Sequence, residues 1–332
     1  MPELPEVETV RRGLDKLIIG KMVAKVAHDT EKSFPNATAD VKEFLIGATI
    51  THVRRRAKVL LIELSSEYSL VIHLKMTGQL VFVKQLQGGS PAKHSETASR
   101  TDSVEYASAE SLAADVPDTS QAHSKELRFG AGHPNASLVN ELPDKSTRVT
   151  FEFDDGSQLF FNDQRKFGWV RLMPTVEVPN INFMQKVGPE PLDADFTWQQ
   201  FAERFKRRAR TSIKAALLDQ TVVAGVGNIY ADESLWGAKI HPKRLVGTIT
   251  DAEFKVLHHE LREVMNLAIE RGGSSDKNYV NAEGKRGSYL SFARVFRREG
   301  QMCPRHPDVE IIKFKAAGRG THICPVCQCS SY

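Results

Sequence analysis

The sequence is poor in cysteine and has no long apolar run, and both absences limit what the protein can be. Only four of its 332 residues are cysteines, and all lie within the last thirty residues. This distribution excludes a disulfide framework for most of the chain. The longest apolar runs, such as Val59 to Ile62, have the length of strands, and the N-terminus is acidic. We therefore expect a cytoplasmic protein with no signal peptide and no membrane-spanning helix.

The sequence also has little excess of either charge, because it contains 45 lysines and arginines and 41 aspartates and glutamates. The balance is uneven along the chain. The segment 86–126 holds seven acidic and three basic residues, so its net charge is −4 and the rest of the chain carries +8. A basic body favours a polyanionic partner. A solvated basic surface without a function explains the same charge equally well.

The acidic segment 86–126 is also poor in apolar residues. It is rich in serine, alanine and threonine, and its only aromatic residue is Tyr106. Such a segment buries too little apolar surface to offset the entropy lost on ordering. We interpret it as a mobile insertion that weakly screens a nearby polyanion-binding face.

The periodicity of the remaining chain changes from strands to helices. Apolar residues recur at helical spacing after Pro5, and Gly20 provides a stop. Strand patterns follow from about 22 to 84, and 147–161 is typical of a hairpin that turns at Asp155 and Gly156. An initial helix followed by strands joined by turns predicts an α+β domain with a β-sandwich or barrel.

The second half of the chain is predicted to be helical up to about residue 272. Thr250 and Glu253 form a capping box before an apolar stripe, and Gly272 follows its end. The proline-rich segment 174–191 is the predicted linker. We expect a domain over 1–173 that contains the insertion, a helical domain over 192–290, and a C-terminal metal-binding unit over 291–332.

Four residues near the C-terminus have the spacing of zinc ligands. Cys303 and His306 form one pair, and Cys324 and Cys327 form a second pair after seventeen residues. Two such pairs can supply four ligands to a tetrahedral Zn²⁺, and a closed set of four indicates one structural metal ion. His322 and Cys329 are alternative candidates for the fourth ligand.

The N-terminus offers a nucleophile. Methionine is normally removed before a small residue such as Pro2, which exposes a secondary amine. An α-amino group has a pKa of about 7.7–8.0, against about 10.4 for lysine, so more of it is unprotonated near neutrality. Glu3 and Glu6 are candidates for proton transfer beside it. Taken alone, a proline and acids that favour a helix start account for the same residues.

Six motifs, in one order along the chain, resemble those of the formamidopyrimidine-DNA glycosylase (Fpg) family. They are Pro2–Glu8, His73–Gly78, Asn162–Gly168, Val187–Leu192, Leu218–Tyr230 and the cysteine-rich segment. The resemblance covers the chain apart from the insertion. It implies an α+β multidomain fold, with an N-terminal helix and β-sandwich, a helix-two-turn-helix domain over 192–290 and a zinc finger over 291–332. Double-stranded DNA would bind between the lobes.

The resemblance also implies a reaction. Members excise oxidised purines, chiefly 8-oxoguanine opposite cytosine and formamidopyrimidines, and then cut the strand by β,δ-elimination in base excision repair. It implies that Pro2 is the Schiff-base nucleophile, that Glu3 is the acid that assists opening of the sugar ring, and that Glu6 is a supporting carboxylate. Lys58 and Arg319 match residues assigned to elimination and phosphate contact.

Further residues match DNA contacts of the family. Met76, Arg165 and Phe167, here called the intercalating trio, would enter the duplex, where Arg165 reads the estranged cytosine. Lys166 lies between two of them, Lys214 and Asn228 match phosphate contacts, and the loop 273–281 matches one that covers the everted base. Without these motifs, Met76 is explained as core filler, Phe167 as a strand residue and Lys214 as a solvated lysine.

Three features depart from the family pattern. His306 stands where a cysteine is usual, which zinc tolerates. The strand before the hairpin reads Lys145–Arg148 where histidines are common, so the DNA contact of one of them is not expected here. The acidic insertion lies between Met76 and Arg165, which predicts a place near the DNA channel.

Two other functions remain as alternatives. The first is an endonuclease VIII-type glycosylase for oxidised pyrimidines, which the residues after Pro2 and the intercalating trio disfavour. The second is a non-catalytic zinc-ribbon protein that binds damaged DNA, which Pro2, Glu3 and Lys58 disfavour. We expect a monomer that acts on bacterial nucleoid DNA in the cytoplasm.

Overall fold

The computed structural model describes residues 2–86, 126–132, 137, 140–273 and 289–329. Most of the acidic insertion and the loop that follows Gly273 lie outside the described residues, so the mobility expected of the insertion and the covering role expected of the loop stay predictions. No helix in the described ranges combines the length and apolarity needed to cross a bilayer.

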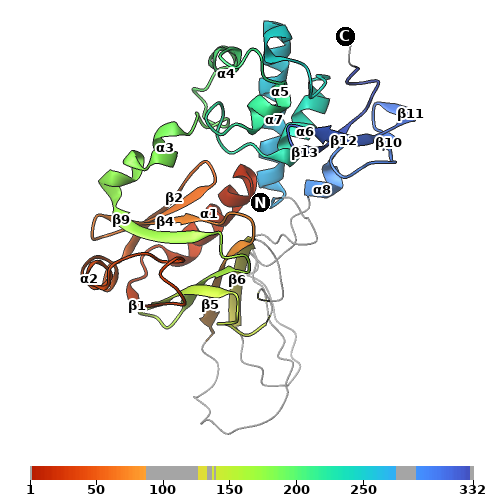
Figure 1. The fold of residues 1–332 in the computed structure, drawn as a ribbon. Helices are drawn as coiled ribbons and strands as arrows, with labels where there is room; N and C mark the ends of the chain where they lie inside the picture. The colour runs from red at the N-terminus through yellow and green to blue at the C-terminus, as the bar shows by residue number, and fades with distance from the viewer. Residues whose placement is uncertain (1, 87–125, 133–136, 138–139, 274–288, 330–332) are drawn as a thin grey trace, which may run out of the picture.

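The chain begins with helix α1 (Leu4–Ile18), as its periodicity predicts. Glu3 and Glu6 form a reciprocal capping box at its start, and Pro5 occupies the first turn. Its apolar stripe is buried against the sheets, and Gly20 leaves the helix with a φ of +83°. The start of α1 lies at the junction between the two halves of the molecule (Figure 1).

Two antiparallel sheets form the predicted β-sandwich, and they share one apolar core with α1. The first sheet has the order β1-β7-β8-β5-β6, and the second has the order β2-β3-β4-β9. The strands of the first are β1 (Val23–His28), β5 (Gly78–Gln85), β6 (Glu126–Gly132), β7 (Thr147–Phe153) and β8 (Gln158–Asp163). Those of the second are β2 (Ile50–Arg56), β3 (Val59–Leu64), β4 (Tyr68–His73) and β9 (Trp169–Pro174). The short α2 (Thr38–Asp40) and η1 (Val41–Leu45) lie between β1 and β2.

The acidic insertion connects the end of β5 to the start of β6, at one end of the first sheet. Gln85 and Glu126 are register partners in the antiparallel pair of β5 and β6. Met76 precedes the opposite end of β5, which is about 24 Å away for an eight-residue strand. The insertion is therefore rooted at the end of the sheet remote from Met76 and Arg165, although it lies between them in sequence.

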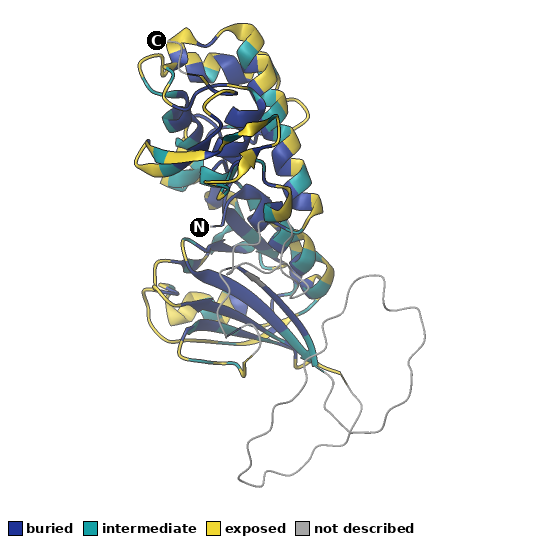
Figure 2. Ribbon diagram, turned by 90° about the vertical axis from the view of Figure 1, so that its right-hand side faces the viewer, coloured by how far each residue is buried: buried dark blue, intermediate teal, exposed yellow. Residues whose placement is uncertain are grey.

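The segment predicted as a linker contains two short helices, η4 (Thr175–Asn180) and α3 (Asn182–Lys186). A second core follows, built from α4 (Trp198–Lys206), α5 (Ile213–Leu218), α6 (Asn228–Gly237), η5 (Val246–Thr248), α7 (Asp251–Glu270) and α8 (Tyr289–Phe292). Thr250 and Glu253 form the expected capping box of α7, and Gly272 has a φ of +72°. Residues 230–237 of α6 are all buried, as expected for a central helix. Figure 2 shows buried segments, in dark blue, inside the helical half.

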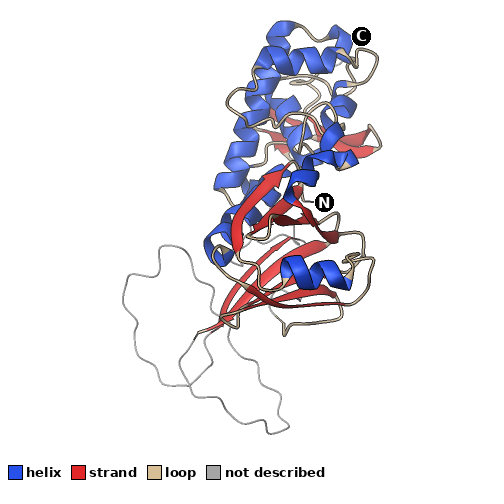
Figure 3. Ribbon diagram, turned by 90° about the vertical axis from the view of Figure 1, so that its left-hand side faces the viewer, coloured by secondary structure: helices blue, strands red, loops and turns tan. Residues whose placement is uncertain are grey.

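Two hairpins end the described chain. The first pairs β10 (Met302–Cys303) with β11 (His306–Glu310), and the second pairs β12 (Ile312–Ala316) with β13 (Arg319–Ile323). Ala317 and Gly318 form the turn of the second hairpin, with φ values of +49° and +69°. Figure 3 shows these strands lying against the helical half, apart from the sandwich.

Candidate active site and nucleic-acid interface

The loop before α6 packs directly on the start of the chain. The Gly225 carbonyl accepts a hydrogen bond of 3.0 Å from the Leu4 amide, and the Ile229 amide donates one of 3.2 Å to Glu3 Oε1. A Cβ atom at Gly227 would collide with the Glu3 carboxyl group, and one at Gly225 would lie 2.5 Å from Leu4 Cβ. These glycines therefore allow the helical half to enclose Pro2 and Glu3, which are both buried.

Two carboxyl groups lie side by side at this junction. Glu6 Oε2 accepts a hydrogen bond of 2.8 Å from the Glu3 amide, and Glu6 Oε1 accepts one of 2.6 Å from the Tyr230 hydroxyl. Glu3 Oε2 is buried without a hydrogen-bond partner. Burial raises the pKa of Glu3 to about 7, with Lys58 opposing the shift and the charge of Glu6 adding to it. Glu3 can therefore hold or release a proton near neutral pH.

Lys58 completes this group from the sandwich side. Its Nζ donates a hydrogen bond of 2.9 Å to the Val226 carbonyl, and the residue is only 4% exposed. Burial lowers the pKa of Lys58, Glu3 and Glu6 oppose that shift, and the positive charge of Arg319 adds to it. Arg319 is exposed at the start of β13, so the second hairpin of the C-terminal unit directs a cation toward the same junction.

Glu190 holds the turn that presents Lys58, a role that the sequence did not reveal. Its carboxylate accepts hydrogen bonds from the Ala57 amide at 2.5 Å, from Arg55 at 2.8 Å and from Arg56 at 3.0 Å. Ala57 has a φ of +52°, which is uncommon for a residue with a Cβ atom. The only available signal was the position of Glu190 within the Val187–Leu192 motif.

A second group of predicted residues is exposed at the β4–β5 and β8–β9 connections. Met76 is 39% exposed and Phe167 is 49% exposed. The interpretations of Met76 as core filler and of Phe167 as a strand residue are therefore wrong. The Arg165 guanidinium lies over the Phe167 ring, 4.8 Å from its centroid. Lys166 is also exposed, and its Nζ lies 3.9 Å from Asp29.

Lys214 is buried, so the interpretation of a solvated lysine is also wrong. Its Nζ donates to Asp232 Oδ1 at 2.6 Å and to Thr321 Oγ1 at 2.7 Å, which ties α5 to α6 and β13. Burial lowers the pKa of Lys214, and Asp232 opposes the shift. Asn228 is half-buried and donates a hydrogen bond of 2.9 Å to the Gly320 carbonyl. In this conformation both side chains hold the second hairpin against the helical half.

Arg148, which stands in the strand where the family commonly has histidines, is buried. It donates hydrogen bonds to the Asp163 carbonyl at 2.8 Å, to Asp29 at 2.6 Å and to the Lys145 carbonyl at 3.0 Å. These bonds account for all three nitrogens of its guanidinium. Arg148 therefore supports the start of the loop that follows β8 through the Asp163 carbonyl. The absence of a histidine-type DNA contact in this segment stays a prediction.

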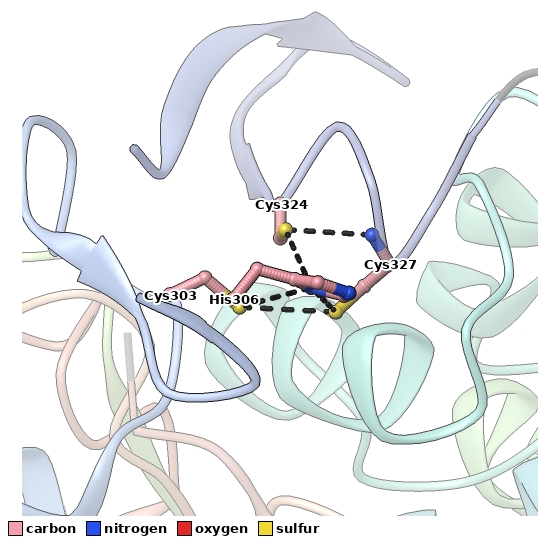
Figure 4. A group of neighbouring side chains, drawn as sticks. All are labelled: Cys303, His306, Cys324 and Cys327. Carbon is pink, nitrogen blue, oxygen red and sulfur yellow. Dashed lines mark hydrogen bonds between the residues drawn. The ribbon is translucent and has the colours of Figure 1, made fainter. Parts of the chain in front are cut away.

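The four predicted metal ligands converge at the first hairpin of the C-terminal unit (Figure 4). The Cys303 and Cys327 sulfurs are 3.7 Å apart, and His306 Nδ1 lies 3.1 Å from Cys327 Sγ and 3.7 Å from Cys324 Sγ. Ligand atoms around a tetrahedral Zn²⁺ are about 3.8 Å apart for zinc–sulfur bonds of about 2.3 Å. The donor set and its spacing therefore fit a metal ion.

The two alternative ligands lie elsewhere. His322 Nδ1 lies 3.1 Å from Asp232 Oδ2, and its Nε2 lies 3.3 Å from Glu299. Cys329 is exposed and does not belong to the cluster. His306 is thus the histidine that the fold brings to the cysteines.

Comparison with known proteins decides the family. A model of the formamidopyrimidine-DNA glycosylase N-terminal domain matches residues 1–170, and a model of the H2TH domain of the same enzymes matches 187–279. The chain belongs to the formamidopyrimidine-DNA glycosylase family. Curated members from Pediococcus pentosaceus and Streptococcus mutans are 37% and 35% identical to this glycosylase, over 99% of both chains in each pair.

Solved structures agree. The glycosylase aligns with the Lactococcus lactis Fpg bound to DNA with an abasic site at a TM-score of 0.75 and 32% identity. The complex of a Lactococcus lactis Fpg mutant with Fapy-dG DNA gives a TM-score of 0.75 and 33% identity. Each alignment covers 99% of this chain and 100% of the other. The chain thus has the fold of this family, as its motifs predicted, and is a DNA glycosylase of base excision repair for oxidised purines.

Proposed function

We propose that this glycosylase removes 8-oxoguanine opposite cytosine, and formamidopyrimidines, from double-stranded DNA through a Schiff base on Pro2. It then cuts the strand by β,δ-elimination. The observation that carries the proposal is the buried junction where Pro2 lies beside Glu3 while Lys58 reaches across to Val226. A carboxyl group with a pKa of about 7 lies next to a potential amine nucleophile. The positive charge of Lys58 acts on that carboxyl group, and the positive charge of Arg319 acts on Lys58.

The order of events follows from the groups present. After removal of Met1, the lone pair of the Pro2 nitrogen attacks C1′ while the bond from C1′ to the damaged base breaks. The base leaves with the bonding electron pair and takes up a proton, and the attacking nitrogen loses its own proton. Protonated Glu3 gives its proton to O4′ as the C1′–O4′ bond opens, and the product is an iminium ion. The iminium ion acidifies the 2′ carbon, so loss of a 2′ proton expels the 3′ phosphate in the β-elimination. Loss of a 4′ proton from the resulting conjugated iminium ion then expels the 5′ phosphate in the δ-elimination. Glu6 holds the Glu3 amide in place, and Lys58 and Arg319 provide positive charge near the phosphates.

The exposed second group is proposed to contact the duplex. Met76, Arg165 and Phe167 would fill the space left by the everted nucleotide, with Arg165 on the estranged cytosine and Lys166 on the backbone. Asn228 would contact a phosphate from the start of α6. The phosphate contact expected of Lys214 requires its ammonium to leave Asp232, and it stays a prediction.

We further propose that the metal is one structural Zn²⁺ held by Cys303, His306, Cys324 and Cys327. Bound there, the ion would link the first hairpin to the segment that follows β13, the strand that carries Arg319, and it would take no part in the chemistry. The domain boundaries proposed are those set out above: 1–173, a linker over 174–191, 192–290 and 291–332. The enzyme is proposed to act as a monomer in the bacterial cytoplasm.

Borohydride trapping on an 8-oxoguanine:cytosine duplex tests the nucleophile. We expect a covalent adduct with the processed protein, and no adduct with Pro2→Gly or with a form that keeps Met1. Persistence of the adduct in both variants would overturn the assignment of Pro2.

The two alternative functions are tested by parallel assays. An endonuclease VIII-type enzyme would excise thymine glycol faster than 8-oxoguanine. A non-catalytic binder would bind the lesion tightly without cutting the strand. We expect preferential excision of 8-oxoguanine together with strand scission.

A further inference from the structure

We propose that Asp163 is a positioning residue that holds the whole intercalating trio in place, and with it the reading of the base opposite the lesion. This inference rests on the proposed role of Met76, Arg165 and Phe167. Asp163 is the last residue of β8 and is 1% exposed. It does not reach the DNA-facing surface itself, so any effect on DNA must pass through the residues it holds.

The Asp163 carboxylate accepts hydrogen bonds from several backbone amides of the loop that follows it. Oδ2 accepts hydrogen bonds from the Phe167 amide at 2.8 Å and from the Gly168 amide at 2.7 Å. Oδ1 accepts one of 3.2 Å from the Arg165 amide. Three backbone amides of the loop thus bind one side chain, that of Asp163. The side chains of Arg165 and Phe167 remain exposed.

The same carboxylate reaches the third member of the trio. Thr77, which follows Met76, donates its hydroxyl proton to Asp163 Oδ1, and its oxygen accepts a hydrogen bond of 3.1 Å from the Arg165 amide. Gly78 and Asp163 are register partners where β5 pairs with β8. One buried acid therefore connects the turn that carries Met76 to the loop that carries Arg165 and Phe167.

The loop adopts a conformation that needs such support. Lys166 has a φ of +55°, which is uncommon for a residue with a Cβ atom and persists only when its surroundings fix it. A Cβ atom at Gly168 would lie 2.8 Å from Phe161 Cζ and 3.2 Å from Asp163 Oδ2, so glycine permits the amide to approach. Arg148 Nε also donates a hydrogen bond of 2.8 Å to the Asp163 carbonyl.

A carboxylate suits this position better than an amide. It accepts on both oxygens, whereas asparagine accepts on one and would direct its NH₂ group at the donors of the loop. The Arg165 guanidinium stacks on the Phe167 ring, 4.8 Å from its centroid. Side chains fixed before binding lose less entropy when they enter the duplex, and a small misplacement of such a group costs much of its effect.

The test compares Asp163→Asn with the matched control Asp155→Asn. Asp155 caps the turn at the other end of β8 through the Ser157 amide at 3.1 Å, so the same substitution there removes a turn-capping charge far from the trio. Single-turnover excision is measured on duplexes with 8-oxoguanine opposite cytosine and opposite adenine, and lyase activity on single-stranded abasic DNA. The third substrate has no opposite base to read.

We expect Asp163→Asn to lower excision opposite cytosine about a hundredfold and to lower the cytosine-over-adenine ratio, and we expect Arg165→Ala to lower that ratio too. Single-strand lyase activity of Asp163→Asn should stay within about twofold of the wild type. Thr77→Val should lower excision opposite cytosine about tenfold, and Thr77→Ser, which keeps the hydroxyl, should restore it. Asp155→Asn should resemble the wild type on all three substrates.

The outcomes separate the inference from the function on which it rests. If Arg165→Ala lowers the ratio but Asp163→Asn and Thr77→Val do not, the positioning role is wrong. If Asp163→Asn lowers activity equally on all three substrates, its role is merely structural and the inference fails. If Arg165→Ala itself leaves the ratio unchanged, the proposed reading role of Arg165 fails first.

Discussion

Lys58 and Val226 meet across the junction between the sandwich and the helical half, where Lys58 Nζ donates a hydrogen bond of 2.9 Å to the Val226 carbonyl. The loop of Val226 also contacts Leu4 and, through Ile229, Glu3. The residues proposed for the chemistry are therefore oriented by contacts between the two halves and not by either half alone. Contacts from both halves thus act on the pKa of Glu3, because Lys58 comes from the sandwich and the Ile229 amide from the helical half.

The pH dependence of base excision should reflect Glu3. Its pKa of about 7 means that the carboxyl group is protonated below neutrality and ionised above it. Since the proposed role of Glu3 is to donate a proton, we expect the single-turnover rate to fall as the pH rises through about 7. Glu3→Gln should lower base excision about 10²–10⁴-fold and remove the alkaline limb.

Preformed abasic DNA provides the control for Glu3. Its ring opens without the enzyme, so Glu3→Gln should retain lyase activity on it. The raised pKa of Glu3 also affects the free energy of unfolding, because burial penalises the ionised carboxylate. The free energy of unfolding should therefore fall as the pH rises from about 4.5 to 7. Glu3→Gln should not show this fall. A variant that kept the alkaline limb would show that another group donates the proton.

Glu190→Gln should impair both stability and activity. The substitution removes the charge that Arg55 and Arg56 face and weakens the bond to the Ala57 amide, so Lys58 loses the turn that positions it. Removing one partner from a buried ion pair costs about 3–5 kcal/mol, and we expect the free energy of unfolding to fall by about 3 kcal/mol. Urea denaturation measures the loss, and trapping yield measures the effect on activity.

An exposed acid gives the matched control for Glu190. Glu203 pairs with Arg207, and both side chains are 69% exposed. Glu203→Gln should change the free energy of unfolding by less than about 0.5 kcal/mol. If Glu190→Gln proved as mild, the turn before Lys58 would be held by its own backbone preferences.

Local signals in the sequence predicted the elements well. The capping box of Thr250 and Glu253, the hairpin turn at Asp155 and Gly156, and the stop at Gly20 each depend on residues within a few positions of one another. Hydrogen bonds of that range follow from sequence spacing alone. The spacing of Cys303, His306, Cys324 and Cys327 similarly predicted the metal cluster.

The contacts that organise the site could not be predicted in this way. Glu190 bonds to a turn more than 130 positions earlier, and Asp163 bonds to Thr77 across 86 positions. No periodicity connects such partners, because they meet only when the strands and the two halves are in place. The burial of Lys214 was missed for the same reason, since its partner Thr321 comes from the C-terminal hairpin.

The Lys214–Asp232 pair should be strongly coupled. Both side chains are 0% exposed, so Lys214→Met leaves the Asp232 carboxylate buried without its cation. We expect a loss of about 3–5 kcal/mol in the free energy of unfolding, and a double variant with Asp232→Leu should lose less than the two single variants together. Lys206→Met is the matched control, because Lys206 and Asp251 are 52% and 61% exposed, and it should cost about 0–1 kcal/mol. Strictly additive losses would show that the pair contributes no specific interaction.

Metal content should depend on His306 and not on Cys329. Elemental analysis should find one zinc per chain in the wild type and in Cys329→Ser, because Cys329 is exposed and outside the cluster. His306→Ala should lose most of the metal, whereas His306→Cys should retain it, since thiolate and imidazole are both zinc ligands. Because metal binding stabilises the fold that supplies its ligands, a chelator should lower the melting temperature of the wild type but not that of His306→Ala. Full zinc content in His306→Ala would instead assign the fourth position to a residue that this fold holds away from the cysteines.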